Sequence, residues 1–303
     1  MASKEFIDLW RELEPAMKRF HSRTEIADFR SDWDAMFTVA DPTLAVRHED
    51  VDADGVPARW IYGADAADSD RTILYLHGGG FVLGSLESHG DLMARISRAA
   101  RCKLLGVAYR LAPEHPFPAA NEDIETVWNW LLAHGQDPRK AAIMGDSAGG
   151  GLVLTTALRL RELARPQPAS LVMFSPWVDL TQSGNSMTRR ARVDRMVTAE
   201  ILGTMAAVYF QACTPSPSDV RAYPLNADFS GLAPLLAQVG ADEVLYDDAA
   251  RIIERASAAG VHAELAVYAD MCHVFQLFAH RIPEARDAIA KAVRFVLEHF
   301  DDH

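Results

Sequence analysis

The sequence of 303 residues predicts an α/β fold, with a mostly parallel central sheet of about eight strands and helices on both faces. From residue 71 onward, short apolar runs typical of buried strands alternate with longer segments whose apolar residues recur at helical spacing. Such alternation favours parallel pairing, because each helix carries the chain back across one face of the sheet. One long segment, residues 181–212, interrupts the alternation and predicts an added helical cap.

The first part of the chain is predicted to hold two helical segments and two strands. Apolar side chains such as Phe6, Leu9 and Trp10 recur every three or four positions, and Trp33 belongs to a second helical stripe. A turn at residues 52–55 joins the two strands. The four elements are expected at residues 3–20, 33–37, 44–51 and 58–62.

The regular alternation that follows places the expected functional loops. Strands are expected at residues 71–76, 103–108, 141–144, 170–174, 234–240 and 263–268. Helices are expected at residues 87–100, 119–133, 147–163, 248–259 and 283–298. In open parallel sheets, ligands bind beyond the carboxyl ends of the strands, so the loops after these strands are where functional side chains are expected.

The segment 181–212 contains its own predicted helix at residues 198–211 and offers an apolar surface. We expect a single domain of residues 1–303, with a cap formed by residues 1–40 and about 181–212. The alternative is that residues 198–211 form an ordinary surface helix with one buried stripe.

Composition narrows the classes of partner and cofactor. The formal net charge of −12 argues against a nucleic-acid partner and disfavours an anionic membrane surface, which suggests a neutral or apolar substrate. Three widely spaced cysteines, Cys102, Cys213 and Cys272, form no CxxC pair and support neither a disulfide framework nor a zinc site. The first twenty residues lack the apolar stretch of a signal peptide, so a cytoplasmic location is expected. No metal or organic cofactor is expected.

Two glycine-rich motifs follow predicted strands. Residues 145–149 read GDSAG and lie between a strand and a helix, which is typical of a tight turn that presents a nucleophilic serine, here Ser147, above a sheet. Residues 77–81 read HGGGF and follow the strand at 71–76, where backbone N–H groups can face a developing oxyanion. Together the two motifs predict acyl transfer.

A serine nucleophile needs a base, and five histidines follow Ser147 in the chain. They are His262, His273, His280, His299 and His303. His273 alone follows directly on the last predicted strand, in the loop 269–273, and is therefore the predicted base.

The orienting acid is expected in the loop after the strand at 234–240. Asp247 and Asp248 lie where a helix is predicted to begin, so helix capping is their default role. Asp242 comes immediately past the end of the strand and is the predicted acid. Glu243 is its adjacent competitor.

The predicted oxyanion hole consists of three backbone N–H groups. Ala148 follows the nucleophile, and Gly79 and Gly80 allow close approach of the backbone to a substrate. Residues 149–151 superficially suggest a phosphate-binding loop, but no GxxxxGK[ST] lysine follows them.

The chain resembles the bacterial hormone-sensitive-lipase-like esterases of the α/β-hydrolase fold. The blocks that carry the resemblance are residues 77–81, residues 145–149 and the sequence YRLAPEHPFPAA at 109–120. The resemblance implies Ser147, Asp242 and His273 as a catalytic triad. One departure is that Glu243 stands where many relatives carry proline.

The resemblance also assigns roles outside the triad. Residues 109–120 would brace the oxyanion loop, with Arg110, Glu114 and His115 in a buried polar network. His77 would orient its own loop, and Asp146 would tether the serine turn.

The expected function is hydrolysis of short- to medium-chain acyl esters through an acyl-enzyme intermediate. The expected partner is a small apolar ester, and the sequence leaves a homodimer open. The substrate pocket is expected to involve Phe81, Met196, Leu202, Met205 and Tyr209. Alternatives are a lactone or acetyl-ester hydrolase with the same triad, an amide hydrolase, and a non-catalytic small-molecule receptor on the same fold.

Overall fold

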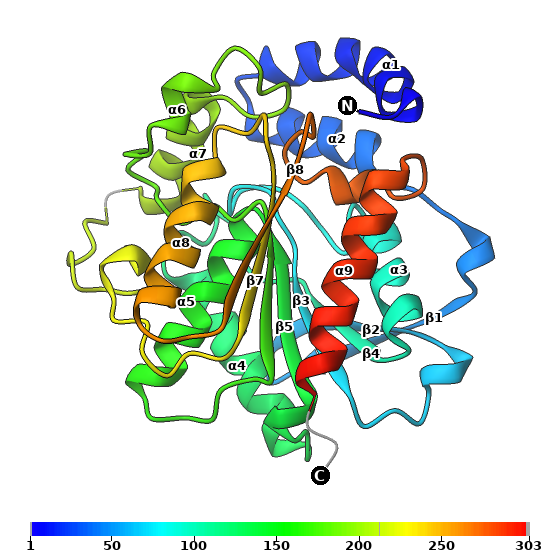
Figure 1. Ribbon diagram of the computed structural model, residues 1–303, viewed down its shortest axis with the longest axis vertical. Helices are drawn as coiled ribbons and strands as arrows, with labels where there is room; N and C mark the ends of the chain where they lie inside the picture. Colours follow the sequence, from blue (N-terminus) through cyan, green and yellow to red (C-terminus); the bar gives the residue numbers. More distant parts are fainter. Residues whose placement is uncertain (1, 212, 301–303) are drawn as a thin grey trace.

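A computed structural model describes residues 2–211 and 213–300, which form a sheet flanked by helices (Figure 1). The strand order is β1-β2-β4-β3-β5-β6-β7-β8. The strands are β1 Val46–Ala53, β2 Val56–Gly63, β3 Thr72–Leu76, β4 Lys103–Val107, β5 Ala141–Asp146, β6 Ser170–Phe174, β7 Leu235–Gly240 and β8 Ala263–Tyr268. Pairing is antiparallel between β1 and β2 and between β2 and β4, and parallel from β4 to β8.

Two helical layers cover the sheet. The helices are α1 Lys4–His21, α2 Ile26–Phe37, α3 Gly90–Ala100, α4 Ala119–Ala133, α5 Ala148–Glu162, α6 Ser186–Arg189, α7 Ala199–Phe210, α8 Tyr246–Ala258 and α9 Pro283–His299. Neighbouring strand residues point to opposite faces, so Ile143 packs on the side of α4 and α5 while Met144 packs on the side of α3 and α9. Every residue of β3, β5, β6 and β7 is buried, which explains why these strands read as continuous apolar runs.

The N-terminal helices and the described part of the 181–212 insertion, residues 181–211, gather at one end of the molecule; residue 212 lies outside the described residues. In Figure 1, α1 and α2 (blue) lie at the same end as α6 and α7. Phe20 of α1 packs edge-on against Phe29 of α2, with 4.9 Å between ring centroids, and Nε2 of His21 lies 3.0 Å from the carbonyl oxygen of Met196. The two segments that are far apart in sequence therefore contact each other directly.

The predicted fold class is confirmed, and most element boundaries agree to within three residues. Two differences are larger: α2 begins seven residues before the expected start at 33, and the short helix α6 was not predicted. The start of α3 shows why a boundary shifts. A helix was expected from residue 87, but the hydroxyl of Ser85 accepts the N–H of Ser88, and the hydroxyl of Ser88 accepts the N–H of Ser85. These local bonds hold a turn, so the helix begins only at Gly90.

Candidate active site

The turn between β5 and α5 forces Ser147 into an unusual backbone conformation. Its φ is 51° and its ψ is −119°, values that side-chain-bearing residues rarely adopt. Glycine neighbours make this turn sterically feasible. A Cβ on Gly145 would lie 2.7 Å from the backbone of Gly149, and a Cβ on Gly149 would lie 2.0 Å from the carbonyl oxygen of Leu76. The predicted tight turn is therefore present.

The loop after β8 brings His273 to this turn. Nε2 of His273 lies 2.9 Å from Oγ of Ser147, which is hydrogen-bonding distance. The two side chains belong to residues that are only 4% and 7% exposed. This pair has the geometry of a serine nucleophile and its general base.

Glu243, and not Asp242, is the carboxylate that contacts His273. Oε2 of Glu243 lies 2.8 Å from Nδ1 of His273. Oε1 of Glu243 accepts a hydrogen bond from Oγ of Ser175 at 2.7 Å and another from the N–H of Gly240. Glu243 is completely buried. A buried carboxylate is stable only when it is paired with another group and hydrogen-bonded, and these contacts meet both conditions.

The prediction of Asp242 as the orienting acid is therefore wrong. Past the end of β7 the chain makes a turn in which the N–H of Glu243 donates to the carbonyl oxygen of Gly240. This turn directs the side chain at position 243 back toward the sheet, whereas Asp242 is only partly buried. Burial, followed by the charge of Asp270, raises the pKa of Asp242.

The neighbouring aspartates do not cap α8 either. The residue at the helix start is Leu245, so Asp247 and Asp248 lie inside the first turn. Asp248 accepts hydrogen bonds from the N–H groups of Val178 and Asp179, both at 2.9 Å. These bonds join α8 to the loop that follows β6.

Opposing effects set the pKa of His273. Burial alone lowers the pKa of this imidazole, because a charged ring is poorly solvated inside the protein. The hydrogen bond and charge of Glu243, with the charges of Asp194 and Asp146, outweigh burial and raise the pKa above its ordinary value. A raised pKa is the expected result where carboxylates stabilise an imidazolium.

The glycine loop after β3, which is bonded to the serine turn through the N–H of Gly78 and Asp146, offers backbone donors. Gly79 and Gly80 have φ values of 122° and 62°, a region that favours glycine. Within residues 2–211 and 213–300, the N–H groups of Gly79, Gly80 and Ala148 donate no hydrogen bond to another protein group. These are the three donors that the sequence predicted for an oxyanion hole.

A buried network ties the glycine loop to the serine turn. Oδ1 of Asp146 accepts the hydroxyl of Tyr75 at 2.8 Å and the N–H of Gly78 at 3.0 Å. Oδ2 of Asp146 lies 3.3 Å from Nε2 of His89. Asp146 thus joins the glycine loop to the turn, which agrees with its expected tethering role.

His77 also takes part in holding the glycine loop. Its Nδ1 lies 2.8 Å from the carbonyl oxygen of Gly78, and its own carbonyl oxygen accepts the hydroxyl of Tyr109 at 2.6 Å. Burial, together with the charge of His89, lowers the pKa of His77 to about 4. A neutral ring suits a structural role within this loop.

The 109–120 segment braces the site differently from the expectation. Arg110, Glu114 and His115 are exposed, so the prediction of a buried polar network is wrong. Glu114 instead pairs with Arg30 of α2 at 2.8 Å, and Arg30 also donates to the carbonyl oxygens of Val82 and Ala112. Arg30 can bond Glu114 and both carbonyl oxygens because the N–H groups of its planar guanidinium reach several acceptors at once.

The residues expected to line the pocket occupy three different environments. Phe81 and Tyr209 stack with 4.0 Å between ring centroids, and the hydroxyl of Tyr209 donates to Asn121. Met196 and Leu202 are buried in the core. Met205 packs against Gly80, since its sulfur lies 2.1 Å from where a Cβ on Gly80 would be.

A cavity of about 440 Å³ opens beside the glycine loop. It is lined by α1 and α2 residues, the end of the loop, and α7: His21, Arg23, Thr24, Ile26, Phe29, Val82, Leu83, Thr198, Glu200, Ile201, Thr204, Met205 and Val208. Of the five predicted pocket residues, Met205 alone lines this cavity. Phe81 and Tyr209 line a much smaller apolar space of about 10 Å³ together with Trp177.

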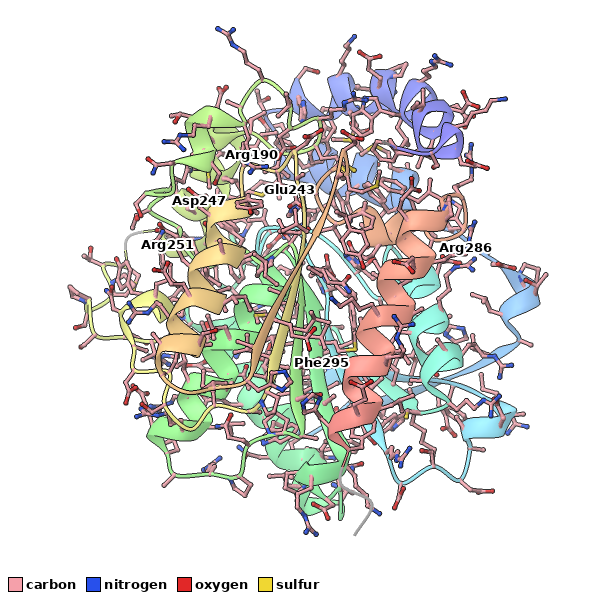
Figure 2. The ribbon with its side chains drawn as sticks, in the orientation of Figure 1. Arg190, Glu243, Asp247, Arg251, Arg286 and Phe295 are labelled. Carbon is pink, nitrogen blue, oxygen red and sulfur yellow. The ribbon has the colours of Figure 1, made fainter. Side chains whose placement is uncertain are left out.

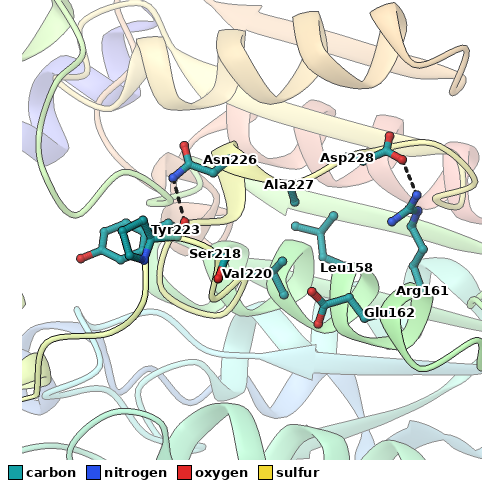
Figure 3. Close-up of a pocket in the computed structure, with 10 residues that line it drawn as sticks. Leu158, Arg161, Glu162, Ser218, Val220, Tyr223, Asn226, Ala227 and Asp228 are labelled. Carbon is teal, nitrogen blue, oxygen red and sulfur yellow. Dashed lines mark hydrogen bonds and ion pairs between the residues drawn. The ribbon is translucent and has the colours of Figure 1, made fainter.

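Figure 3 shows another cavity, of about 440 Å³. The end of α5 and the loop 217–228 form it, and an Arg161–Asp228 ion pair spans part of its edge. None of its lining residues belongs to the Ser147 constellation. In the described part of the chain, no group of three or more histidine, cysteine or acidic residues could hold a metal ion. Nor does any described helix have the length and hydropathy needed to cross a membrane.

Comparisons with known proteins agree with this geometry. A family model described as the α/β hydrolase fold matches residues 73–277. An acetyl-hydrolase of Streptomyces hygroscopicus is 40% identical over 240 residues, which cover 79% of each chain. An esterase of Acinetobacter venetianus is 36% identical over 229 residues, covering 76% of this chain and 75% of the relative. The crystal structure of an esterase from the bacterial hormone-sensitive lipase family superposes with a TM-score of 0.92 at 42% identity, covering 99% of this chain and 100% of the other.

Proposed function

The chain belongs to the α/β-hydrolase family, among the bacterial hormone-sensitive-lipase esterases, and we propose that it hydrolyses carboxylic esters through an acyl-enzyme formed on Ser147. The observation that carries this proposal is the continuous hydrogen-bond chain from Glu243 through His273 to Ser147. Three such groups in that order can activate a hydroxyl, hold the base in the right tautomer and stabilise its charged form.

The proposed reaction has two stages. In the first, Nε2 of His273 takes the proton of Ser147 while Oγ attacks the ester carbonyl carbon. The negative oxygen accepts hydrogen bonds from the N–H groups of Gly79, Gly80 and Ala148, and the imidazolium then protonates the departing alcohol. In the second stage Nε2 of His273 takes a proton from water, whose oxygen attacks the carbonyl carbon of the acyl-enzyme. The bond between that carbon and Oγ of Ser147 then breaks, the imidazolium returns its proton to Oγ, and the carboxylic acid leaves.

We propose that residues 1–40 and 181–212 act as a cap on a single domain of residues 1–303. The contact between His21 and Met196, and the packing of Met205 on Gly80, support this assignment. Because Met205 packs on the glycine loop and lines the cavity at the cap, we expect small apolar esters with short- to medium-length acyl chains. An acetyl-ester or lactone hydrolase is the second candidate, favoured by the 40% identity to a protein named acetyl-hydrolase.

The two other candidate functions are a non-catalytic receptor, which the site disfavours, and amide hydrolysis. A non-catalytic receptor on this fold has no need of a complete chain of serine, histidine and carboxylate, and all three groups are within hydrogen-bonding distance here. Amide hydrolysis needs well-placed protonation of an amine leaving group. Turnover of matched p-nitrophenyl ester and anilide substrates separates these functions from ester hydrolysis.

Partners and location are also part of the proposal. We expect a small apolar ester as substrate and neither a nucleic acid nor a membrane as partner, which the net charge of −12 supports. A cytoplasmic location is supported by three free cysteines, two of them buried, since thiols persist in a reducing compartment. Cell fractionation tests the location, and light scattering decides between a monomer and a homodimer.

Two measurements test the proposed reaction. Hydrolysis of p-nitrophenyl esters from acetyl to palmitoyl should fall about 10⁶-fold in kcat in Ser147→Ala. A p-nitrophenyl phosphonate should lose p-nitrophenol to Oγ of Ser147, so the peptide that contains Ser147 should gain the mass of the phosphonyl group in the wild type, and no peptide should gain it in the variant. Undiminished hydrolysis by Ser147→Ala, or labelling of a different residue, would contradict the mechanism.

A further inference from the structure

The 181–212 insertion holds the backbone of Val244, the residue next to Glu243, on both sides. Oδ2 of Asp194 accepts the N–H of Val244 at 2.8 Å. The hydroxyl of Ser186 donates to the carbonyl oxygen of Val244. The peptide groups of Val244 therefore cannot shift without breaking a bond to the insertion, and Glu243 is attached directly to them.

Further contacts join the same two segments. The N–H of Ser186 donates to Oδ2 of Asp247 at 2.9 Å, and the N–H of Asp247 donates to Oγ of Ser186 at 3.1 Å. The guanidinium of Arg190 lies 3.9 Å from the ring centroid of Tyr246, a cation–π contact. Figure 2 shows Arg190, Glu243 and Asp247 in the same region of the molecule.

Asp194 also reaches toward α7 with its other oxygen. Oδ1 of Asp194 accepts the N–H groups of Met196 and Val197, at 2.9 and 3.0 Å, just before α7 begins. One carboxylate thus bonds both the loop that carries Glu243 and the entry to the helix that carries Met205.

The charge of Asp194 acts on the same site. Burial raises the pKa of Asp194. The charge of His273 and the N–H groups of Val197 and Val244, which donate to the Asp194 carboxylate, oppose this rise. In turn, Asp194 is one of the negative charges that raise the pKa of His273. Glu243 acts electrostatically on both Asp194 and His273, and Asp146 acts on His273. The neighbouring thiol of Cys272 is in turn affected by the charges of Glu243, Asp194 and Arg195.

We propose that Asp194 is a positioning residue, which fixes Glu243 against His273 through the backbone of Val244. Ser186 is the uncharged member of the same clamp. This inference rests on the proposed ester hydrolysis at Ser147. It gives the cap a direct mechanical connection to the catalytic acid.

Asp194→Asn tests the inference because it keeps the shape of the side chain but removes its charge. Its amide can accept from Met196 and Val197, but then its NH₂ group meets the N–H of Val244, donor against donor. We expect kcat for p-nitrophenyl acetate to fall roughly 10- to 100-fold, with a much smaller change in KM. The acidic limb of kcat/KM should move to lower pH by up to about one unit.

Ser186→Ala and Asp242→Asn complete the design. Ser186→Ala removes a clamp bond without removing a charge, so kcat should fall while the acidic limb stays in place. Asp242→Asn removes a charge from the neighbouring position and should behave as the wild type. Thermal melting of each variant reports on folding separately.

Each outcome decides a separate point. If Asp194→Asn folds and shows the wild-type kcat and an unmoved acidic limb, the positioning role is overturned. If Asp194→Asn does not fold, an unchanged kcat in Ser186→Ala overturns it instead. Ser147→Ala, assayed beside them, reports on the proposed function alone. If Ser147→Ala retains full activity, the nucleophile is wrong; if it is inactive and Asp194→Asn is normal, only the role of Asp194 is wrong.

Discussion

Oε2 of Glu243 lies 2.8 Å from Nδ1 of His273, although Asp242 is the first carboxylate beyond the end of β7. The distinction between two consecutive acids is chemically decisive, because only the one that accepts from Nδ1 can stabilise the imidazolium. Ser175 holds the other oxygen of Glu243, and the hydroxyl of Ser175 also accepts the N–H of Val274 at 3.0 Å. The acid and the loop of the base thus share a hydrogen-bonding partner.

Glu243→Gln should lower kcat about 10⁴-fold, the size of effect seen when the acid of a serine triad becomes an amide. Gln keeps the volume but cannot supply the charge or enforce the tautomer of His273. Kinetics with p-nitrophenyl acetate measure the effect. Asp242→Asn is the matched control, and a crippled Asp242→Asn beside an active Glu243→Gln would restore Asp242 as the acid.

The pH dependence of activity should report the raised pKa of His273. The neutral ring is the base, so kcat/KM should rise with pH through an apparent pKa above 6.5, the ordinary value for histidine. The same raised pKa stabilises the folded protein below the ordinary value, and this contribution is lost as pH rises through the folded-state pKa. Activity and this stability term therefore change in opposite directions. A limb centred at or below pH 6.5 would contradict the prediction.

Met205→Ala should shift the preference toward longer acyl chains. The Met205 side chain packs on Gly80 at the edge of the 440 Å³ cavity, so its removal extends the space next to the glycine loop. We expect the ratio of kcat/KM for hexanoyl over acetyl esters to rise roughly 10-fold. Val208→Ala, which trims the same cavity from the same helix, is the control. Equal ratios in both variants would show that the contact with Gly80 has no special effect.

Gly149→Ala should destabilise the fold by about 1–3 kcal/mol or more, because the new Cβ would lie 2.0 Å from the carbonyl oxygen of Leu76. Backbone cannot move aside as a flexible side chain can. Gly90→Ala, at the start of α3, meets nothing within 4 Å and should change stability by less than about 1 kcal/mol. Chemical denaturation of both variants measures the difference, and similar midpoints would contradict it.

Local pattern was sufficient where a residue's role depends on its immediate neighbours. The strand Ser170–Phe174 and the helix Ala119–Ala133 lie where their apolar spacing placed them. The tight turn at Ser147 follows from its glycine neighbours, and His273 follows from its place after the last strand. Glu243 could not be separated from Asp242 in this way, because the difference depends on how one turn directs two adjacent side chains.

Long-range contacts decided the rest. Asp194 lies fifty residues before Val244 in sequence, and nothing in its local pattern distinguishes it from a solvated aspartate. Ser175 follows a strand end, the one signal that could have suggested it. Met196 and Leu202 are as apolar as Met205, yet only Met205 lines the cavity at the glycine loop.

By itself, the sequence determined the fold class, the nucleophile turn, the glycine loop and the choice of His273, because each depends on short motifs at strand ends. Only the tertiary structure decided which carboxylate orients His273, which cap side chains face the cavity, and how the insertion contacts Val244. The physical reason is that these features depend on side-chain direction and on contacts between segments far apart in the chain. Neither leaves a periodic or local signal in the sequence.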